Sequence, residues 1–306
     1  MKIITNELER IADVPLLYLN PYLSNGESMA QVYVALLHLN PTGSHKVLSY
    51  QSMVEAEERN GLNPDTIFVD YTTGNAGIAG AFVCAQKGYA FSVFMPENMS
   101  YEKIQMLRCL GADIHLTPKE KFILGAKQEA VEYSKTINRI LLDQSSNPNN
   151  AKGYEIVGEK LIKTLGKIDV FVCGSGTYGT ITGISRKLKP TGTEIICIEA
   201  EYAPHIFAKR KGVDVTFQPH NLIGFGAELL ASNAHPELYD HVEIINEETA
   251  VKTMKAMHKK GFLIGKTSGA NIYWAIKIAQ ELGPGKIVAT NTFDGFERLI
   301  TENIYK

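Results

Sequence analysis

The chain has 306 residues, 44% of them hydrophobic and 21% charged, which are the proportions of an ordinary globular protein. Its 31 Lys and Arg against 33 Asp and Glu give a formal net charge of −2, so no basic excess attracts nucleic acid or an anionic membrane. No apolar run approaches the roughly 18 residues of a membrane-spanning helix, and the acidic Glu7 interrupts the first residues, which argues against a secretory signal. We therefore expect a cytoplasmic protein with no nucleic-acid and no membrane partner.

The cysteines give no sign of a metal site or of a disulfide framework. None of the four belongs to a C-x-x-C pair, and none has a histidine at the spacing of zinc ligands. Cys173 and Cys197 lie in apolar, strand-like runs, so we expect buried thiols there. The eight histidines form no ligand cluster, and we expect no metal.

Strand-like and helix-like segments alternate along the chain. In chain order the pattern predicts a strand at 30–39, a helix at 46–59, a strand at 66–71, a helix at 76–87, a strand at 91–95, a helix at 100–110, a strand at 114–116, a helix at 123–135, a strand at 140–142, a helix at 154–165, a strand at 170–173, a helix at 179–188, a strand at 195–198, helices at 246–260 and 270–282, and a strand at 287–289. Such alternation is typical of βαβ units and mostly parallel sheets. The polar stretch 144–150 (QSSNPNN) is the best internal boundary.

Ligands bind at the carboxyl ends of strands in open α/β sheets, so the loops that follow strands are the candidate binding sites. The first, residues 40–46 (NPTGSHK), places Lys46 at the start of a predicted helix. The positive end of the helix dipole and the apolar residues that follow both lower an amine's pKa. A lowered pKa suits a lysine that acts as a nucleophile or forms a Schiff base, although a solvated lysine at a helix end has the same sequence pattern.

Three further loops are rich in small hydrogen-bonding residues. Residues 72–77 (TTGNAG) offer backbone N–H groups, hydroxyls and an amide at a helix start, which suits a carboxylate or a simple helix cap. Residues 174–180 (GSGTYGT) follow a strand, open a helix and are typical of a phosphate cradle. Residues 266–270 (KTSGA) open another helix, where their hydroxyls are either ligands or caps.

The third loop also fits a different class of enzyme. Its G-x-G-x-x-G pattern, with Glu199 20 residues after Gly179, matches the dinucleotide-binding fingerprint and predicts an NAD-dependent oxidoreductase as the alternative. The fingerprint normally opens its domain, whereas this loop lies in mid-chain, and a dinucleotide site leaves the first two loops without a role.

Taken together, the loops resemble the cysteine synthase and cystathionine β-synthase family of fold-type II pyridoxal-phosphate (PLP) enzymes. The resemblance runs in order along nearly the whole chain, through the motifs at 40–46 (NPTGSHK), 72–77 (TTGNAG), 144–148 (QSSNP), 176–180 (GTYGT), 219–220 (PH) with 224–227 (GFGA), and 267–270 (TSGA). It implies two three-layer αβα domains with mostly parallel sheets and PLP in the cleft between them, as in the tryptophan synthase β-like fold. We expect residues 1–38 and 146–306 to form the large domain and residues 39–145 the small one.

The resemblance also implies roles for individual residues. Lys46 carries the Schiff base and moves the substrate's α-proton, Asn75 contacts the ring hydroxyl, and Thr267 or Ser268 binds the pyridine nitrogen. The implied cofactor-binding set is Lys46, Asn75, Gly176, Thr177, Tyr178, Gly179, Thr180, Thr267 and Ser268. The implied substrate-binding set is Thr72, Thr73, Asn75 and Gln144.

Several positions depart from the family pattern. Ala76 stands where a threonine is usual, so one donor to the substrate carboxylate is missing, and Tyr178 replaces a glycine of the phosphate loop. Glu228 falls where a small residue is common, and we interpret it either as a base near the cleft or as a solvated surface acid. For His45, beside Lys46, we expect a packing or surface role.

The resemblance implies β-replacement or β-elimination on a serine- or cysteine-type amino acid through an aminoacrylate intermediate. The favoured reaction is cysteine synthase-like, in which an O-activated serine and sulfide give cysteine. The alternatives are hydrogen sulfide release from cysteine and a cystathionine- or diaminopropionate-type synthesis, and we expect a small amino-acid substrate with a thiol, sulfide or amine nucleophile. A homodimer is also implied.

Overall fold

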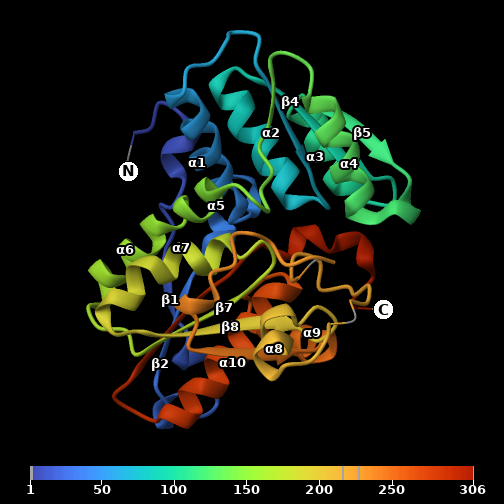
Figure 1. The fold of residues 1–306 in the computed structure, drawn as a ribbon. Coiled ribbons are helices and arrows are strands. Elements are labelled where there is room, and N and C mark those ends of the chain that lie inside the picture. Colours follow the sequence, from blue (N-terminus) through green and yellow to red (C-terminus); the bar gives the residue numbers. More distant parts are fainter. Residues whose placement is uncertain (1–2, 216, 227, 306) are drawn as a thin grey trace.

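The computed structural model describes residues 3–215, 217–226 and 228–305 (Figure 1). Its strands are β1 (Leu16–Tyr18), β2 (Gln31–Ala35), β3 (Ile67–Tyr71), β4 (Ala90–Pro96), β5 (Asp113–Thr117), β6 (Arg139–Leu141), β7 (Val170–Gly174), β8 (Glu194–Ala200), β9 (His241–Ile245) and β10 (Ile287–Asn291). Its helices are α1 (Lys46–Arg59), α2 (Asn75–Lys87), α3 (Tyr101–Cys109), α4 (Phe122–Ser134), α5 (Pro148–Lys152), α6 (Glu155–Leu165), α7 (Gly179–Leu188), α8 (His205–Lys211), α9 (Glu247–His258) and α10 (Lys266–Leu282).

The strands form two separate sheets. The larger has the order β1-β2-β10-β7-β8-β9 and is parallel except for β1, which runs antiparallel to β2. The smaller has the order β5-β4-β3-β6 and is parallel throughout. The prediction of an α/β fold with two mostly parallel sheets is therefore confirmed, whereas the exact domain boundaries at 38/39 and 145/146 stay a prediction.

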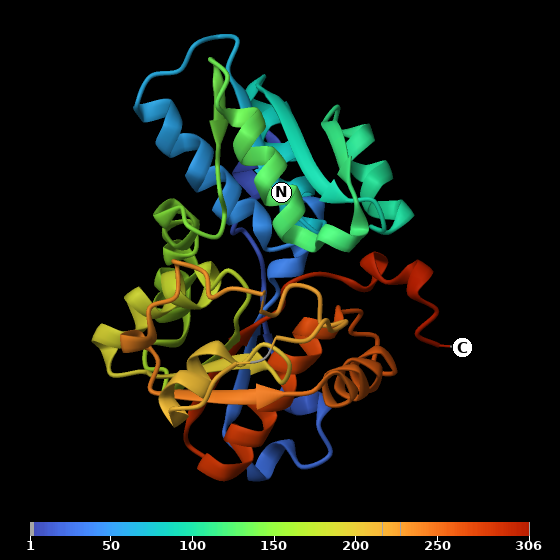
Figure 2. The same cartoon turned by 45° about the vertical axis from the view of Figure 1, so that its right-hand side comes forward.

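Helices pack around both sheets, and the central strands β3, β4, β7 and β8 are almost entirely buried. Every residue of β7 is buried, as in a parallel strand that is covered on both faces. Around the larger sheet α6 packs against α7 and α9 packs against α10, while in the smaller unit α4 packs on β3 and β4 and α1 packs against α2. Figures 1 and 2 show the two units one above the other, with the early strand β2 in the lower unit beside the late strand β10.

The sequence pattern predicted α1 and α7 with their observed bounds, but it misplaced or missed other segments. The strand predicted at 30–39 ends at Ala35, because residues 37–39 turn into a short 3-10 helix. Asn246 caps α9 as expected and accepts a hydrogen bond from the Thr249 N–H at 2.9 Å, whereas Ser100 makes no capping hydrogen bond at α3. The pattern missed β1, β9, α5 and α8, which are all short.

The segment that follows β10 connects the two units. It runs between them in Figures 1 and 2 and makes side-chain hydrogen bonds to the small unit through Asp294 and Thr301. Within the described residues, no helix is long and apolar enough to cross a membrane, and no group of three or more His, Cys, Asp or Glu could hold a metal ion. Cys173 and Cys197 are buried as expected, and so is Cys84, whereas Cys109 is exposed.

Candidate active site

A cavity of about 430 Å³ lies between the two units and is lined by residues of both. It lies at the carboxyl ends of β3 and β7, where an open α/β fold places its ligands. The smaller unit contributes the loop that follows β3, and the larger unit contributes the loop that follows β7 and the start of α10. From the predicted site residues the lining includes Lys46, Thr72, Thr73, Asn75, Gln144, Gly176, Thr177, Tyr178, Thr180 and Thr267.

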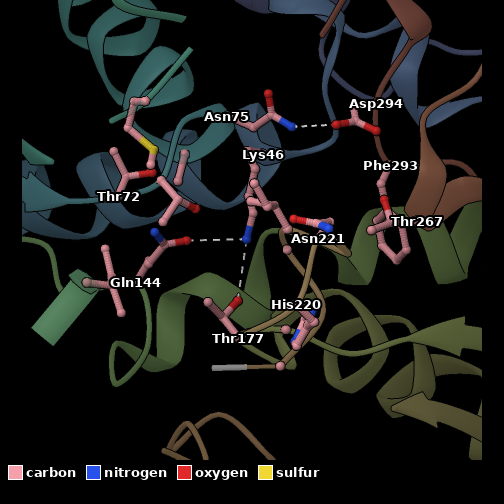
Figure 3. A pocket seen from close by; sticks show the side chains of 18 of the residues that line it. Lys46, Thr72, Asn75, Gln144, Thr177, His220, Asn221, Thr267, Phe293 and Asp294 are labelled. Atoms are coloured by element: carbon pink, nitrogen blue, oxygen red, sulfur yellow. Dashed lines mark hydrogen bonds between the residues drawn. The ribbon is translucent and has the colours of Figure 1, made fainter. Parts of the chain in front are cut away.

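Lys46 is the first residue of α1 and points into this cavity (Figure 3). Its Nζ donates to Gln144 Oε1 at 3.2 Å and to Thr177 Oγ1 at 3.5 Å, so it joins groups from both units. Lys46 keeps some accessible surface because it faces the cavity, but it lies deep in the protein, and burial lowers its pKa to about 8. The charge of Asp70 opposes this shift.

Asp70 is a functional candidate that the sequence reasoning missed. It lies in β3, is fully buried, and accepts a hydrogen bond from the Tyr50 hydroxyl at 2.6 Å. Burial raises the pKa of its carboxyl to about 7, although the Tyr50 bond opposes this. A charged residue inside the apolar run 66–71 (TIFVDY) is the sequence signal that could have revealed it.

His45 fixes the start of α1 by packing. Its N–H donates to the Phe293 carbonyl oxygen at 2.9 Å, and its ring lies 4.7 Å from the Phe293 ring, centroid to centroid. Its Nδ1 also lies 3.1 Å from Thr180 Oγ1, which ties the Lys46 segment to the first turn of α7.

The loop 174–180 is shaped to present backbone N–H groups to the cavity. The N–H groups of Gly176, Thr177 and Tyr178 donate to no other described residue, and they precede the first turn of α7. A Cβ on Gly176 would lie 2.0 Å from the Gly224 carbonyl oxygen, and one on Gly179 would lie 2.0 Å from an Asn150 oxygen. The two glycines therefore allow a close approach of the backbone that no side chain would permit.

Tyr178 turns its side chain away from this cradle. It adopts a left-handed conformation with φ of 59°, and its hydroxyl donates to Glu199 Oε1 at 2.5 Å. The side-chain hydroxyl of Tyr178 is therefore engaged within the protein, and only its backbone N–H is available to a cofactor. Glu199 also accepts from the N–H groups of Ile206 and Phe207 at 2.9 Å, so protein donors occupy the acid that a dinucleotide site would need for the ribose.

The loop 72–77 is held partly by itself and partly by distant segments. Thr72 Oγ1 accepts from the Gly74 N–H at 2.9 Å, and the Asn75 amide donates to Asp294 Oδ2 at 2.7 Å (Figure 3). Asp294 is partly buried, and desolvation raises the pKa of its carboxyl. No local pattern in the sequence predicts this partner of Asn75, which lies near the other end of the chain.

At the start of α10 the structure separates the two predicted partners of the pyridine nitrogen. Thr267 lines the cavity, and its hydroxyl makes no hydrogen bond to another described residue. The Ser268 hydroxyl accepts from the Phe293 N–H at 2.9 Å and is buried. Of the two hydroxyls, that of Thr267 is thus the one at the cavity, and α10 begins at Lys266 rather than at the predicted residue 270.

The structure also shows where two residues that depart from the family pattern lie. Ala76 is buried in the cavity wall, and Glu228 lines the cavity as an exposed residue. The motif 224–227 is described up to Gly226, and Ala227 lies outside the described residues.

Comparisons with known proteins assign the family. The model of the family "Pyridoxal-phosphate dependent enzyme" matches residues 8–292. The cysteine synthase of Staphylococcus aureus (strain Mu50) is 37% identical over 286 residues, which cover 91% of this chain and 90% of that protein. This chain belongs to the cysteine synthase family of pyridoxal-phosphate dependent enzymes.

Solved structures of this family agree with the assignment. An O-acetylserine dependent cystathionine β-synthase from Helicobacter pylori is 30% identical, with a TM-score of 0.89 and full coverage of both chains. A cysteine synthase from Entamoeba histolytica is 28% identical, with a TM-score of 0.92 over 99% of this chain and 91% of that chain. The predicted family, cofactor and fold type are confirmed.

The residues of the cavity also fit pyridoxal phosphate by their own chemistry. The cofactor needs an amine with a lowered pKa, donors for a phosphate and a partner for a ring nitrogen. Lys46, the free N–H groups of the loop 174–180 and the Thr267 hydroxyl supply these groups around one cavity.

Proposed function

We propose that the protein catalyses a β-replacement on an O-activated serine, with sulfide or a thiol as the nucleophile, in the manner of a cysteine synthase. The observation that carries the proposal is the Lys46 amine, which is buried between a phosphate cradle and a carboxylate-binding loop. The relatedness to cysteine synthases supports the reaction class.

In this proposal both units hold the cofactor, the smaller one through Lys46 and the larger one through the phosphate and the ring nitrogen. Lys46 binds it covalently, the backbone N–H groups at 176–179 with the Thr177 and Thr180 hydroxyls bind its phosphate, and Thr267 binds its ring nitrogen. Asn75 approaches the ring hydroxyl from the smaller unit. Ser268 has no part in this set, because its hydroxyl is engaged by the backbone of Phe293.

Pyridoxal phosphate, when bound, makes the α-proton of the amino acid acidic enough to be removed. The protein then has to bind the substrate carboxylate and move that proton. Thr72, Thr73, Asn75 and Gln144 bind the carboxylate, and Lys46 Nζ takes the proton from the α-carbon and later returns one to it. Its lowered pKa, near 8, allows the amine to act as a base at neutral pH.

The neutral partner of the ring nitrogen influences the reaction type. A hydroxyl such as that of Thr267 does not stabilise a protonated ring nitrogen, whereas a carboxylate does. The weaker electron withdrawal favours loss of a β-substituent over transamination. This supports a replacement or elimination reaction at the β-carbon.

The test is to supply the holoenzyme with O-acetylserine and sulfide and to measure cysteine by a thiol-specific assay. We expect cysteine formation, and we expect Lys46→Ala to lower it by about 10³-fold, within the range for losing a general base. Formation of pyruvate alone would indicate a lyase. No product from O-acetylserine, O-phosphoserine, serine or cysteine would contradict the proposal.

We further propose a homodimer in a reducing, cytoplasmic compartment, with residues 1–38 and 146–306 as the large domain and residues 39–145 as the small one. Four free cysteines are compatible with a reducing compartment. Light scattering of the purified protein tests the oligomeric state, and a molar mass of about 34 kDa, that of a monomer, would contradict the dimer.

A further inference from the structure

Lys103 is a buried cation without a partner in the wall of the cleft. The residue lies on α3, is 7% exposed and lines the cavity that holds Lys46. Its amine makes no hydrogen bond or ion pair within 4.0 Å to another described residue. A buried ammonium without a direct partner is costly, and burial lowers the pKa of Lys103, although the charges of Asp294, Glu302 and Glu102 oppose this shift.

The carboxylates near Lys103 are all engaged by other donors. Asp294 accepts from the Asn75 amide at 2.7 Å, Glu302 pairs with Lys266 at 2.7 Å, and Glu102 accepts from the Thr301 hydroxyl at 3.0 Å. Lys266 shows the contrast, because this second buried lysine of the cleft has the carboxylates of both Glu247 and Glu302 within 4.0 Å. None of these carboxylates forms a direct ion pair with the Lys103 ammonium.

The fold holds Lys103 in this position through its stem. The side chain lies over Gly74, where a Cβ would come within 2.6 Å of Lys103 Cδ and 2.9 Å of its Cε. Gly74 has φ of 147°, a conformation that few residues other than glycine adopt. A glycine at the centre of the carboxylate-binding loop thus makes room for the lysine.

Lys103 lies where the inner cavity meets an outer one. The outer cavity, of about 560 Å³, is lined by Lys103, Asn221, Lys266 and Glu302 among others. Its lining includes neither Lys46 nor Gln144, nor the loop 72–77. The groups assigned to the α-carboxylate thus line the inner cavity alone, whereas Lys103 lines both cavities.

We propose that Lys103 binds an anionic group carried by the substituent that enters or leaves at the β-carbon of the substrate. Sulfide carries no group besides its reacting sulfur, whereas a thiol with a carboxylate, or a phosphate ester, has a separate anionic group that Lys103 can bind. The inference rests on the proposed β-replacement and narrows its substrate class to a nucleophile or a β-substituent that carries an anionic group besides the reacting atom.

The test compares wild type with Lys103→Met, which keeps the stem over Gly74 and removes the charge. Lys119→Met is the matched control, because it removes a lysine charge from an exposed position of the same cavity lining. Steady-state kinetics are measured for 3-mercaptopropionate, 2-mercaptoethanol and sulfide with O-acetylserine, and then for O-phosphoserine against O-acetylserine with sulfide.

We expect Lys103→Met to raise the KM of one anionic reactant by about 10- to 100-fold, the range for losing a charge-assisted hydrogen bond. A rise confined to 3-mercaptopropionate assigns the entering group, and one confined to O-phosphoserine assigns the leaving group. The values for sulfide and 2-mercaptoethanol stay unchanged in both cases, as does every value of the Lys119→Met variant.

Three results would overturn the inference. They are equal KM values in wild type and Lys103→Met, a rise for O-acetylserine that assigns Lys103 to the α-carboxylate, and the same shift in Lys119→Met. Each of them requires turnover of O-acetylserine with sulfide by the wild type. An inactive wild type would instead contradict the proposed function, so the two failures are distinguishable.

Discussion

The two loops that face each other across the cleft are built in different ways. The phosphate loop at 174–180 is defined by its glycines, since Gly176 closely approaches the backbone of Gly224 and Gly179 closely approaches Asn150. The substrate loop at 72–77 is instead held by side chains that reach it from other elements. Asp294 binds Asn75, and Lys103 lies on Gly74.

The difference explains why the cofactor is easier to assign than the substrate. A phosphate is bound by backbone N–H groups, so the positions of the glycines largely define the site. The substrate is recognised by side chains, and the partners of those side chains come from α3 and from the segment after β10. If this contrast is correct, substitutions in the loop 174–180 should weaken cofactor binding, and substitutions in the loop 72–77 should weaken substrate binding.

The largest effect is expected from Gly176→Ala in the phosphate loop. The added methyl group would meet the Gly224 carbonyl oxygen at 2.0 Å, so the loop must move and its N–H groups lose their alignment. We expect cofactor affinity to fall by about 100-fold, near the upper range for overpacking. Titration of the apoprotein with pyridoxal phosphate measures this, and unchanged affinity would show that the cradle does not depend on the glycine.

Gly74→Ala tests the other loop and should have a smaller effect of a different kind. Its methyl group would displace the flexible Lys103 side chain and strain a backbone with φ of 147°. We expect the KM for O-acetylserine to rise by about tenfold while cofactor affinity stays within about twofold. Equal losses in both quantities would remove the distinction between the loops.

The pH dependence of cofactor attachment tests the environment of Lys46. Only the neutral amine attacks an aldehyde, and its pKa is near 8, so the rate of attachment should fall about fivefold from pH 8 to pH 7 and level off above pH 9. Stopped-flow absorbance with the apoprotein measures the rate. A rate that still rises steeply at pH 10 would indicate an ordinary lysine pKa.

The lowered pKa of Lys46 also makes the stability of the apoprotein depend on pH. Because the pKa of Lys46 in the folded protein is lower than in the unfolded chain, the unfolded chain binds more protons between about pH 8 and pH 10.5. The contribution of this group to apoprotein stability therefore rises with pH across that window. Denaturant unfolding of the wild type and Lys46→Met, compared at pH 7.5 and pH 10, should show the wild type gaining relative to the variant.

The smallest effect is expected from Tyr178→Phe. The change removes the hydroxyl that donates to Glu199 and leaves the two backbone donors in place. We expect a loss of about 1–3 kcal/mol in the free energy of unfolding, with cofactor affinity lowered only two- to threefold. Thermal unfolding with and without cofactor gives both values. An unchanged melting temperature would mean that the Tyr178–Glu199 bond contributes no net stability.

Much of the fold was accessible from the sequence because its signals are local. Apolar runs and capping residues predicted most helices and parallel strands, including α7 with its observed bounds. The short β1 and β9 were missed, because a few residues at the edge of a sheet carry little periodic signal.

The candidate site was predictable where it depends on backbone conformation and on consecutive residues. The loops around Lys46, Gly176 and Thr267 meet at one cavity as expected. The Asn75–Asp294 bond and the unpaired amine of Lys103 could not be predicted, because each depends on which segments the tertiary fold brings together. Asp70 is marked in the sequence by its place in an apolar run, but its influence on the pKa of Lys46 also depends on the tertiary fold.

Reductive trapping is the most direct test of the central claim, that Lys46 is the residue that binds the cofactor. The holoenzyme is reduced with borohydride, digested and analysed by mass spectrometry, with Lys46→Ala treated in the same way. The account predicts one pyridoxyl-modified peptide, which carries the modification on Lys46 and is missing from the variant. Modification of another lysine in the wild type, or none at all in a yellow holoenzyme, would contradict it.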